Sequence, residues 1–337
     1  MSAHTIELHV SGLATYQDCE RLYNYSYLHG YRLAFDSPPI VFGNYWHFAQ
    51  RLVAGGSSYA EALAATAARQ QELGSLPDPE LWEMFEGLMG GHKLWQETSD
   101  CLYVDSRLEY VSLEEKFTFE LGGYQFGGVW DGVVKHKHLD GLYLIERKTT
   151  YSPNELERGV SWDMQPRFYA YAAEKIYGEP VIGVIYELVR RCNPTQIKVL
   201  KNGWPSKARN ELDGTSYEIY RNFLFDTADK LGYTYETVLI DYAEQLEYLK
   251  LAHNPVFRRI LVPMGEGHKE IAAKTMLYRA AQMNAAQSLG DALPPKLNRY
   301  TCSKCPFKYA CLAQDDGADY ISLLDATFIK DKERFDA

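Results

Sequence analysis

Apolar and polar positions alternate with a period of two over a central stretch of the chain, and both flanks carry a helical spacing instead. The alternating stretch comprises LEYVSLEEKFTFEL, a Gly122-Gly123 turn and residues 124–150, YQFGGVWDGVVKHKHLDGLYLIERKTT. This alternation predicts a three-stranded antiparallel meander whose last two strands form a hairpin. VIGVIYELV follows as a buried strand, so the pattern predicts a mixed α/β core.

The flanks predict helices. Ser11 is a candidate cap for a helix through LATYQDCERLYNYSYLHG that stops at Gly30. A Pro-Pro turn then precedes a helix in VFGNYWHFAQRLVAGG. Further helices are predicted over residues 58–74, 79–99, 154–177, 216–231, 234–252 and 268–288, with a short strand in PVFRRILVPM.

These elements predict a single elaborated domain over residues 1–337, because a chain of this length can bury one large core. Within it we expect a helical N-terminal part, a catalytic α/β core, a helical part with a cysteine-rich end, and a tail. Their ranges are 1–100, 105–200, 201–315 and 316–337.

Composition narrows the function classes. A hydrophobic content of 46% and a charged content of 24% are typical of a soluble globular protein, and no stretch is apolar enough to span a membrane. The start MSAHTIELHV has no signal-peptide pattern, so we expect a cytoplasmic location. A net charge of -10 argues against a nonspecific polycation, but a channel for nucleic acid needs only local positive potential, such as the basic stretch near residues 195–209 could supply.

The predicted hairpin carries charge where buried strands are normally apolar. Side chains alternate along a strand, so Asp131 on one strand and Glu146 with Lys148 on the other are expected to converge. Hard divalent ions such as Mg²⁺ or Mn²⁺ favour carboxylate oxygens, and a lysine beside them can activate water or stabilise phosphorane charge. This pattern predicts metal-assisted phosphodiester cleavage.

The ordinary alternative is a solvated strand face with a cross-strand ion pair, which explains most Glu-x-Lys patterns. Glu146 follows the apolar run Leu142-Tyr143-Leu144-Ile145, however, and an unpaired acid on such a strand is costly. Asp131 also stands among small and apolar neighbours in GGVWDGVV. Their burial favours a functional site.

Other polar residues are candidates for the same site. His47 lies mid-helix among aromatic neighbours, where a satisfied core histidine is the commoner role but a nitrogen ligand to the metal is an alternative. Gln165 and Tyr169 are one helical turn apart and face the same way, so they are candidates to hold the lysine and a DNA phosphate. Glu114 and Glu115 could also belong to the site, although exposed strand acids are commoner.

Three cysteines near the C-terminus have the spacing C-x2-C-x5-C, at Cys302, Cys305 and Cys311. Clustered thiols in an intracellular protein indicate metal, and tetrahedral thiolate sites need four ligands. Cys19 is the best candidate for the fourth, and it would join the two ends of the chain. Zinc and a 4Fe-4S cluster are both compatible with this spacing.

These motifs, in this order, resemble the iron-sulfur branch of the PD-(D/E)xK nucleases. That branch includes RecB-like and AddB-like nuclease domains, the CRISPR-adaptation exonucleases and many phage relatives. The resemblance rests on a helical histidine, G-x-x-D, E-R-K, Q-x-x-x-Y and one N-terminal plus three C-terminal cysteines, and it extends from Cys19 to Cys311.

The resemblance implies a role for each matching residue. His47, Asp131 and Glu146 would bind a divalent metal together with the backbone carbonyl of Arg147, and Lys148 would be the catalytic lysine. Gln165 and Tyr169 would orient the lysine and DNA. The cysteines would hold a structural 4Fe-4S cluster, at Cys19, Cys302, Cys305 and Cys311.

The expected function is therefore a metal-dependent DNA exonuclease acting on single strands or DNA ends, in recombination, repair, or CRISPR or phage DNA processing. A non-catalytic DNA-binding scaffold and a structure-specific endonuclease are the alternatives. No G-x-x-x-x-G-K-[ST] loop is present, so any unwinding would need a helicase or recombinase partner.

Overall fold

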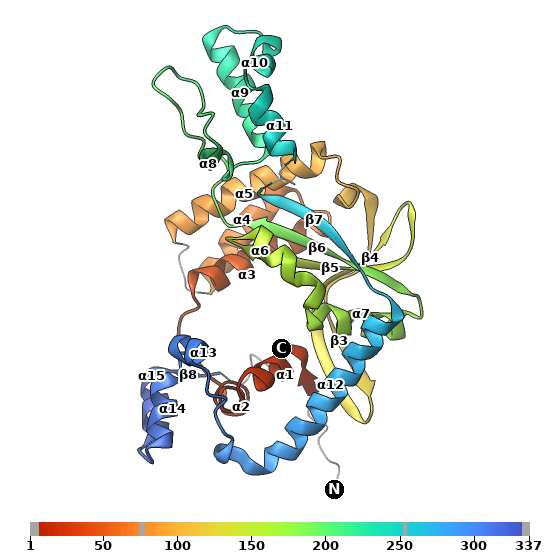
Figure 1. Ribbon diagram of the computed structural model, residues 1–337, viewed down its shortest axis with the longest axis vertical. Helices are drawn as coiled ribbons and strands as arrows, with labels where there is room; N and C mark the ends of the chain where they lie inside the picture. Colours follow the sequence, from red (N-terminus) through yellow and green to blue (C-terminus); the bar gives the residue numbers. More distant parts are fainter. Residues whose placement is uncertain (1–6, 74–77, 252–254, 332–337) are drawn as a thin grey trace.

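A mixed β-sheet forms the centre of the molecule in the computed structural model, which describes residues 7–73, 78–251 and 255–331 (Figure 1). Its strand order is β1-β4-β5-β6-β7, and β3 pairs with β4. The strands are β1 (Glu7–His9), β3 (Leu108–Leu121), β4 (Tyr124–His136), β5 (Leu139–Thr150), β6 (Val181–Arg190) and β7 (Phe257–Pro263).

The predicted meander is confirmed. β3, β4 and β5 are antiparallel neighbours, and the turn between β3 and β4 uses Gly122 and Gly123, both at positive φ, which glycine adopts without steric cost. β6 then lies parallel to β5 after a helical crossover, and β7 closes the sheet antiparallel to β6. β1 and β7 lie outside residues 105–200, so the sheet extends beyond the range predicted for the core.

Both faces of the sheet are covered, because successive residues of its strands point to opposite sides. On one side Val133, Leu144 and Tyr186 pack with Phe168 of α7. The helices that build this layer are α1 (Val10–Asp18), α7 (Met164–Tyr177) and α12 (Glu266–Ala286). On the other side lie α3 (Pro38–Ala54) and α5 (Pro79–Thr98), which share a core with Val189 and Phe257 of the sheet. The helix α4 (Tyr59–Glu72) packs on α3 and α5.

Two predicted helix boundaries in the N-terminal part are wrong. The helix expected from Ser11 to Gly30 begins after His9 and breaks at Cys19, whose backbone is extended with φ -164 and ψ 118. Its pieces are α1, α2 (Glu20–Tyr23) and the π-helix η1 (Asn24–Leu28). The two prolines expected to form a turn instead start α3, because the first helical turn tolerates the missing proline N–H.

The helix expected over residues 154–177 is also divided. It forms α6 (Pro153–Gly159), the 3₁₀ turn η3 (Val160–Trp162) and α7. Asp163 separates them, because its carboxylate caps α7 by accepting a hydrogen bond from the N–H of Gln165 at 3.2 Å. The break therefore places an acidic side chain at the start of α7.

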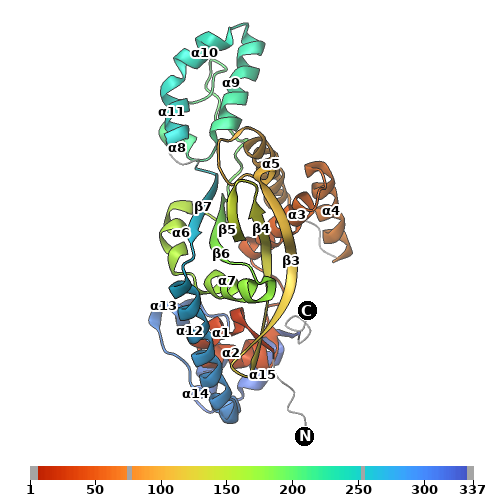
Figure 2. The same cartoon turned by 90° about the vertical axis from the view of Figure 1, so that its right-hand side faces the viewer.

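Residues between β6 and β7 form a helical insertion that projects from one end of the sheet (Figure 2). Its helices are α8 (Arg209–Leu212), α9 (Tyr217–Leu231), α10 (Tyr235–Asp241) and α11 (Ala243–Leu251). The single helix predicted over 234–252 breaks at Tyr242. The insertion has its own core, in which Tyr220, Leu224 and Tyr242 are buried.

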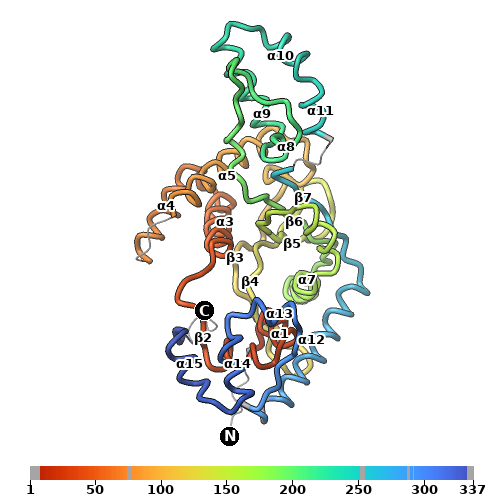
Figure 3. Tube along the Cα trace, turned by 60° about the vertical axis from the view of Figure 1, so that its left-hand side comes forward, coloured from red at the N-terminus to blue at the C-terminus, as the bar shows by residue number. Residues whose placement is uncertain are grey.

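The C-terminal elements pack against α2 and η1 at the end of the sheet opposite to the insertion (Figures 2 and 3). They are the 3₁₀ segment η4 (Gln287–Ala292), α13 (Arg299–Lys304), α14 (Lys308–Asp315), α15 (Tyr320–Thr327) and β8 (Ile329–Lys330). β8 pairs antiparallel with β2 (Tyr31–Arg32), and Tyr25 and Phe307 share a small core. The segment predicted as a tail is thus folded up to β8, and residues 332–337 lie outside the described residues.

Arg21 reinforces this junction. Its guanidinium is buried and donates to the Asp315 carboxylate at 2.6 Å, to the Leu293 carbonyl at 3.3 Å and to the Cys311 carbonyl at 3.2 Å. We call the junction of residues 19–32 with 293–330 the terminal clasp. None of the helices in the described part of the chain is long and apolar enough to cross a membrane.

Candidate active site

Four secondary-structure elements bring the predicted catalytic side chains together. α3 supplies His47, β4 supplies Asp131 and β5 supplies Glu146 and Lys148, while Asp163 caps the start of α7. Alternation along β5 sends Glu146 and Lys148 to one side and Arg147 to the other. The two carboxylates and the amine expected to converge therefore do lie near one another.

Asp131 and His47 form the closest contact. The Asp131 Oδ1 atom lies 3.1 Å from His47 Nδ1, and His47 Nδ1 lies 3.6 Å from an oxygen of Glu114 on β3. The three donor atoms all lie within 4.8 Å of one another, which no other trio of histidine, cysteine or acidic side chains achieves within the described ranges. Glu146, predicted as a metal ligand, is outside this trio.

Glu146 instead pairs with the catalytic-lysine candidate. Lys148 Nζ lies 2.5 Å from Glu146 Oε1 and 4.0 Å from Asp163 Oδ2. Asp163 was not predicted as a site residue, and its only sequence signal was its position as a possible helix cap before Gln165. Lys148 is about one-third exposed, so its amine remains accessible from solvent.

Arg147 was predicted to bind the metal through its backbone carbonyl, but it also makes contacts that hold Asp131. Its backbone N–H donates to Asp131 Oδ2 at 2.6 Å, and its guanidinium donates to the Asp131 carbonyl at 3.2 Å and to the Tyr110 hydroxyl at 2.8 Å. The side chain is 1% exposed. Arg147 therefore fixes Asp131 from behind the sheet.

Behind Arg147 lies a buried ion network that was not predicted from the sequence. Glu187 of β6 accepts from Arg259 Nε of β7 at 2.8 Å and from the Trp46 indole at 3.3 Å, and it lies 3.7 Å from Arg147 Nε. Glu187 and Arg259 are both fully or almost fully buried. Since Trp46 precedes His47, the network couples the helix and strand that carry the site.

These contacts shift the titration of the site. Burial alone lowers the pKa of His47, but the adjacent Asp131 and Glu114 carboxylates outweigh it and raise that pKa to about 10. Burial, reinforced by Asp131, raises the pKa of Glu146 to about 7, although Lys148 opposes the shift. The pKa of Lys148 is raised because the Glu146 carboxylate outweighs its burial. Strong perturbation of several groups at one place is typical of functional sites.

Gln165 and Tyr169 lie together as expected. The Gln165 amide donates to the Tyr169 hydroxyl at 3.1 Å, and Tyr169 is buried under the sheet. A Cβ on Gly128 of β4 would lie 2.5 Å from the Tyr169 hydroxyl oxygen, so glycine is needed for this close approach.

The sequence profile of the PD-(D/E)XK nuclease superfamily matches residues 7–312. The chain belongs to this superfamily. The match runs from β1 to α14 and so includes the whole sheet and every candidate residue described above. An α/β fold with a mixed sheet flanked by helices agrees with membership, and nucleases of this superfamily use divalent metals and act on DNA.

No curated protein matches the chain significantly. Among solved structures, the chain resembles the crystal structure of a "Putative exonuclease" from Eubacterium rectale, with a TM-score of 0.48 and 10% sequence identity. The similarity covers 90% of this chain and 87% of the other. Such a remote likeness does not bear on the activity of this chain.

The donor set suits a divalent metal in this superfamily. A six-coordinate ion with bonds of about 2.1 Å holds neighbouring donors about 3.0 Å apart and opposite donors about 4.2 Å apart. The spacings of 3.1 Å and 3.6 Å from His47 to Asp131 and Glu114 are close to that geometry.

The four predicted cluster cysteines lie in the terminal clasp but are less tightly grouped. No three of their sulfur atoms lie within 4.8 Å of one another among the described residues. Burial raises the pKa of Cys305, and the neighbouring Cys19, Cys311 and Cys302 add to that rise. Cys19 Sγ accepts the N–H of Lys296 at 3.5 Å.

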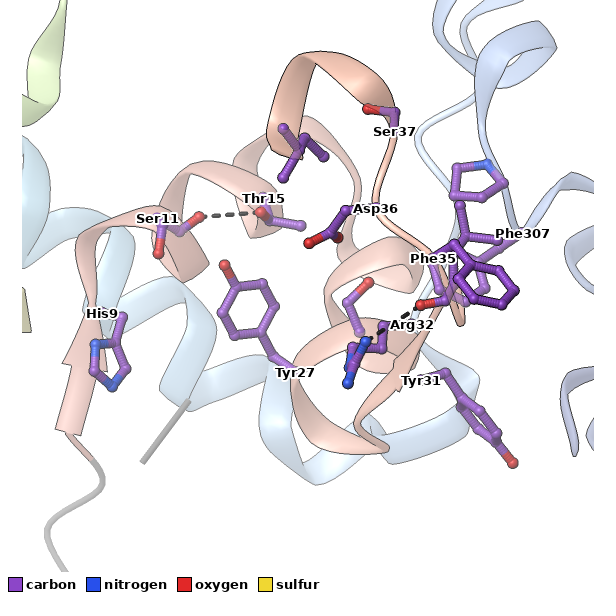
Figure 4. A pocket seen from close by; sticks show the side chains of 14 residues that line it. His9, Ser11, Thr15, Tyr27, Tyr31, Arg32, Phe35, Asp36, Ser37 and Phe307 are labelled. Atoms are coloured by element: carbon purple, nitrogen blue, oxygen red, sulfur yellow. Dashed lines mark hydrogen bonds between the residues drawn. The ribbon is translucent and has the colours of Figure 1, made fainter. Parts of the chain in front are cut away.

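A cavity of about 680 Å³ lies beside the terminal clasp (Figure 4). Tyr27, Phe35, Asp36 and Phe307 line it, and the Thr15 hydroxyl donates to the Ser11 carbonyl at its wall. None of the predicted catalytic residues lines this cavity.

Proposed function

We propose that the protein is a divalent-metal-dependent DNA exonuclease that acts on single strands or free DNA ends. The observation that carries this proposal is the meeting of His47, Asp131, Glu146 and Lys148, from α3, β4 and β5, in a chain of the PD-(D/E)XK superfamily. Oxygen and nitrogen donors next to a lysine suit phosphodiester hydrolysis.

A divalent ion held by His47, Asp131, Glu146 and the Arg147 carbonyl would lower the pKa of a bound water and neutralise a phosphate oxygen. Lys148 positions that water and opposes the charge that develops on the phosphorane. Glu146 keeps the lysine protonated and aligned through their 2.5 Å contact. Gln165 and Tyr169 of α7 would orient the lysine and the DNA.

Exposed aromatic side chains beside the site support a single-stranded substrate. Trp162 is 79% exposed next to Asp163, and Tyr151 is 61% exposed just after β5. The Arg191 guanidinium lies 4.1 Å from the centre of the Tyr151 ring, so a cation accompanies this stacking surface. Unpaired bases stack on such rings, at roughly 1–3 kcal/mol per base, whereas paired bases are not free to do so.

The terminal clasp is proposed to hold a structural 4Fe-4S cluster on Cys19, Cys302, Cys305 and Cys311. A tetrahedral zinc with Zn–S bonds of about 2.3 Å would need sulfur atoms about 3.8 Å apart, whereas a cubane binds each thiolate at a different iron and keeps them farther apart. No three of the four sulfur atoms lie within 4.8 Å of one another in the described part of the chain, so the iron and sulfide content of the protein decides between the two.

Hydrogen bonds to the sulfurs support the same proposal. Arg21 donates to Cys311 Sγ at 3.2 Å, and the Asn298 N–H donates to Cys302 Sγ at 3.4 Å. Donors of this kind stabilise thiolates and tune iron-sulfur clusters. Protein purified without oxygen should contain iron and sulfide and be brown, and Cys305→Ser should lose both. The matched Cys101→Ser variant should keep them; equal iron in both variants would contradict the assignment.

The catalytic proposal is tested with linear single-stranded DNA labelled at either end, in Mg²⁺ or Mn²⁺. Wild type should release mononucleotides or short products, and Lys148→Ala should not. Lys135→Ala is the control, because Lys135 lies on neighbouring β4 but only pairs with Glu179 at the surface. Activity of Lys148→Ala equal to wild type would refute the site.

Circular single-stranded DNA separates an exonuclease, which cannot start on it, from the alternative endonuclease. DNA binding without cleavage by the wild type would favour the scaffold alternative. Recombination, repair, and CRISPR or phage DNA processing, each with a helicase or recombinase partner, are the proposed settings for a cytoplasmic enzyme. Stimulation of duplex digestion by such a helicase would support that partnership.

A further inference from the structure

Glu114 occupies an unusual position on β3. Leu113 pairs with Gly132 and Glu115 pairs with Trp130, so Glu114 stands opposite Asp131. Its φ of 46° makes it the sole non-glycine residue at positive φ in the described part of the chain. A side chain in this left-handed region costs roughly 1–2 kcal/mol.

The carboxylate of Glu114 is also poorly satisfied. Its Oε1 atom is buried and accepts no hydrogen bond. The nearest cationic groups are His47 Nδ1 at 3.6 Å and Arg147 Nη1 at 3.9 Å, and both distances exceed those of hydrogen bonds. A buried acceptor without a donor costs about 1–3 kcal/mol, and more when it is charged. The fold therefore places Glu114 at a strained backbone position and leaves one buried oxygen of its carboxylate, here called the orphan oxygen, without a hydrogen bond.

A cation between the three donors would remove this cost. The orphan oxygen of Glu114 lies with His47 Nδ1 and Asp131 Oδ1 in the trio within 4.8 Å, at spacings that an octahedral ion accommodates. We propose that Glu114 is a direct ligand of the divalent metal, together with His47 and Asp131. This inference rests on the proposed function, because it concerns the same metal.

A structural role is the competing explanation. In that case Glu114 would only balance the charges of His47 and Arg147 and would not touch the metal. This structural explanation is weak, because neither ion pair of Glu114 includes a hydrogen bond. It also gives no reason for the carboxylate to be on a strained residue. The two explanations differ in what happens to metal affinity when the charge of Glu114 is removed.

The addition of Glu114 changes the character of the site. The residues assigned by the resemblance bring two carboxylates, Asp131 and Glu146, and Glu114 makes three with one imidazole. Three anionic oxygen ligands increase the attraction for a divalent ion, and the His47 nitrogen suits Mn²⁺ better than Mg²⁺. We therefore expect Mn²⁺ to bind more tightly than Mg²⁺.

The decisive experiment is calorimetric titration of the full chain with Mn²⁺ alone, without DNA. Glu114→Gln should weaken Mn²⁺ binding at least tenfold. Glu115→Gln is the matched control, because Glu115 is the next residue of β3 but is exposed and bonded to Ser112; its Mn²⁺ affinity should stay within twofold of wild type. Equal affinities of Glu114→Gln and wild type would overturn the proposal.

A second variant covers the case in which Glu114→Gln folds poorly. Glu114→Gly fits the positive φ and removes the orphan carboxylate, so it should melt at or above the wild-type temperature without metal. The increase in melting temperature on adding Mn²⁺ should nevertheless be lost. An increase as large as that of wild type would contradict direct ligation.

Failure of this inference is distinguishable from failure of the proposed function. If wild type binds Mn²⁺ but digests no DNA, and Glu114→Gln loses the binding, the nuclease proposal fails and the ligand assignment stands. If wild type digests DNA and Glu114→Gln binds Mn²⁺ normally, the assignment fails and the nuclease proposal stands.

Discussion

Replacement of Glu187 by glutamine should destabilise the protein more than any surface change. The carboxylate is fully buried, and it accepts from Arg259 at 2.8 Å and from Trp46 at 3.3 Å, with His92 at 3.4 Å and Arg147 at 3.7 Å. Glutamine keeps the volume but removes the negative charge that two buried guanidinium groups share, although Arg259 keeps its contact with Asp105 at 2.6 Å. Breaking a buried pair in this way typically costs about 3–5 kcal/mol in the free energy of unfolding.

The assay is urea denaturation at pH 7 followed by far-ultraviolet circular dichroism. Glu211→Gln is the control, because Glu211 pairs with Lys198 at 2.9 Å on the surface, and its loss should cost under about 1 kcal/mol. A loss below about 1 kcal/mol for Glu187→Gln as well would refute the idea that Glu187 neutralises both arginines.

The pH dependence of the stability difference between wild type and Glu187→Gln gives an independent check. Burial would raise the pKa of Glu187, but Arg259 and its other cationic neighbours outweigh burial and hold that pKa well below its usual 4.5. A depressed pKa in the folded protein means that the stabilisation is present above pH 4.5 and is lost as the pH falls. The difference between wild type and Glu187→Gln should therefore shrink in acid.

Three further predictions concern the metal, the packing of α7 and the terminal clasp. With its pKa near 10, His47 must lose a proton to bind a metal at pH 7. The Mn²⁺ affinity should therefore rise with pH, by at most about tenfold per unit between pH 7 and 9, and calorimetry in buffers of different ionisation enthalpy should detect the released proton. An affinity independent of pH would contradict this. Gly128→Ala should push Tyr169 aside and lower the free energy of unfolding by about 1–3 kcal/mol in a denaturation experiment. Gly90→Ala is the control, because no atom lies within 4 Å of its added Cβ, and it should be neutral or stabilising. Equal effects of the two changes would be inconsistent with the close approach of Gly128 and Tyr169. Arg21→Ala should increase amide hydrogen exchange in residues 305–330 and leave the sheet protected; exchange unchanged from wild type would argue against its role in the clasp.

Much of the catalytic part could be predicted because its signals are local. The period-two pattern gave the meander, and alternation along β5 separated Glu146 and Lys148 from Arg147. Acids placed among apolar residues marked Asp131 and Glu146 as unusual. These features depend on near neighbours in sequence and on strand geometry, so they can be recognised without knowledge of the fold.

The features that could not be predicted depend on register or on distant segments. Glu114 has a positive φ inside a strand, and residue type alone does not reveal such a conformation. The break at Cys19 depends on contacts with residues near 296, far along the chain. Glu187 did carry a readable signal, since it is an acid in the apolar run VIGVIYELV, and the reasoning applied to Glu146 would have found it.

The terminal clasp has a consequence for how the chain acquires its fold during synthesis. Within the described ranges β2 pairs with β8, and the hydrogen-bond acceptors of Arg21 lie 272 to 294 residues later. Contacts of such long sequence separation form late and slowly, because a large loop must close first. The tyrosine-rich segment around Tyr25 therefore leaves the ribosome long before its partners exist. During that interval its apolar surface is open to chaperones and to aggregation.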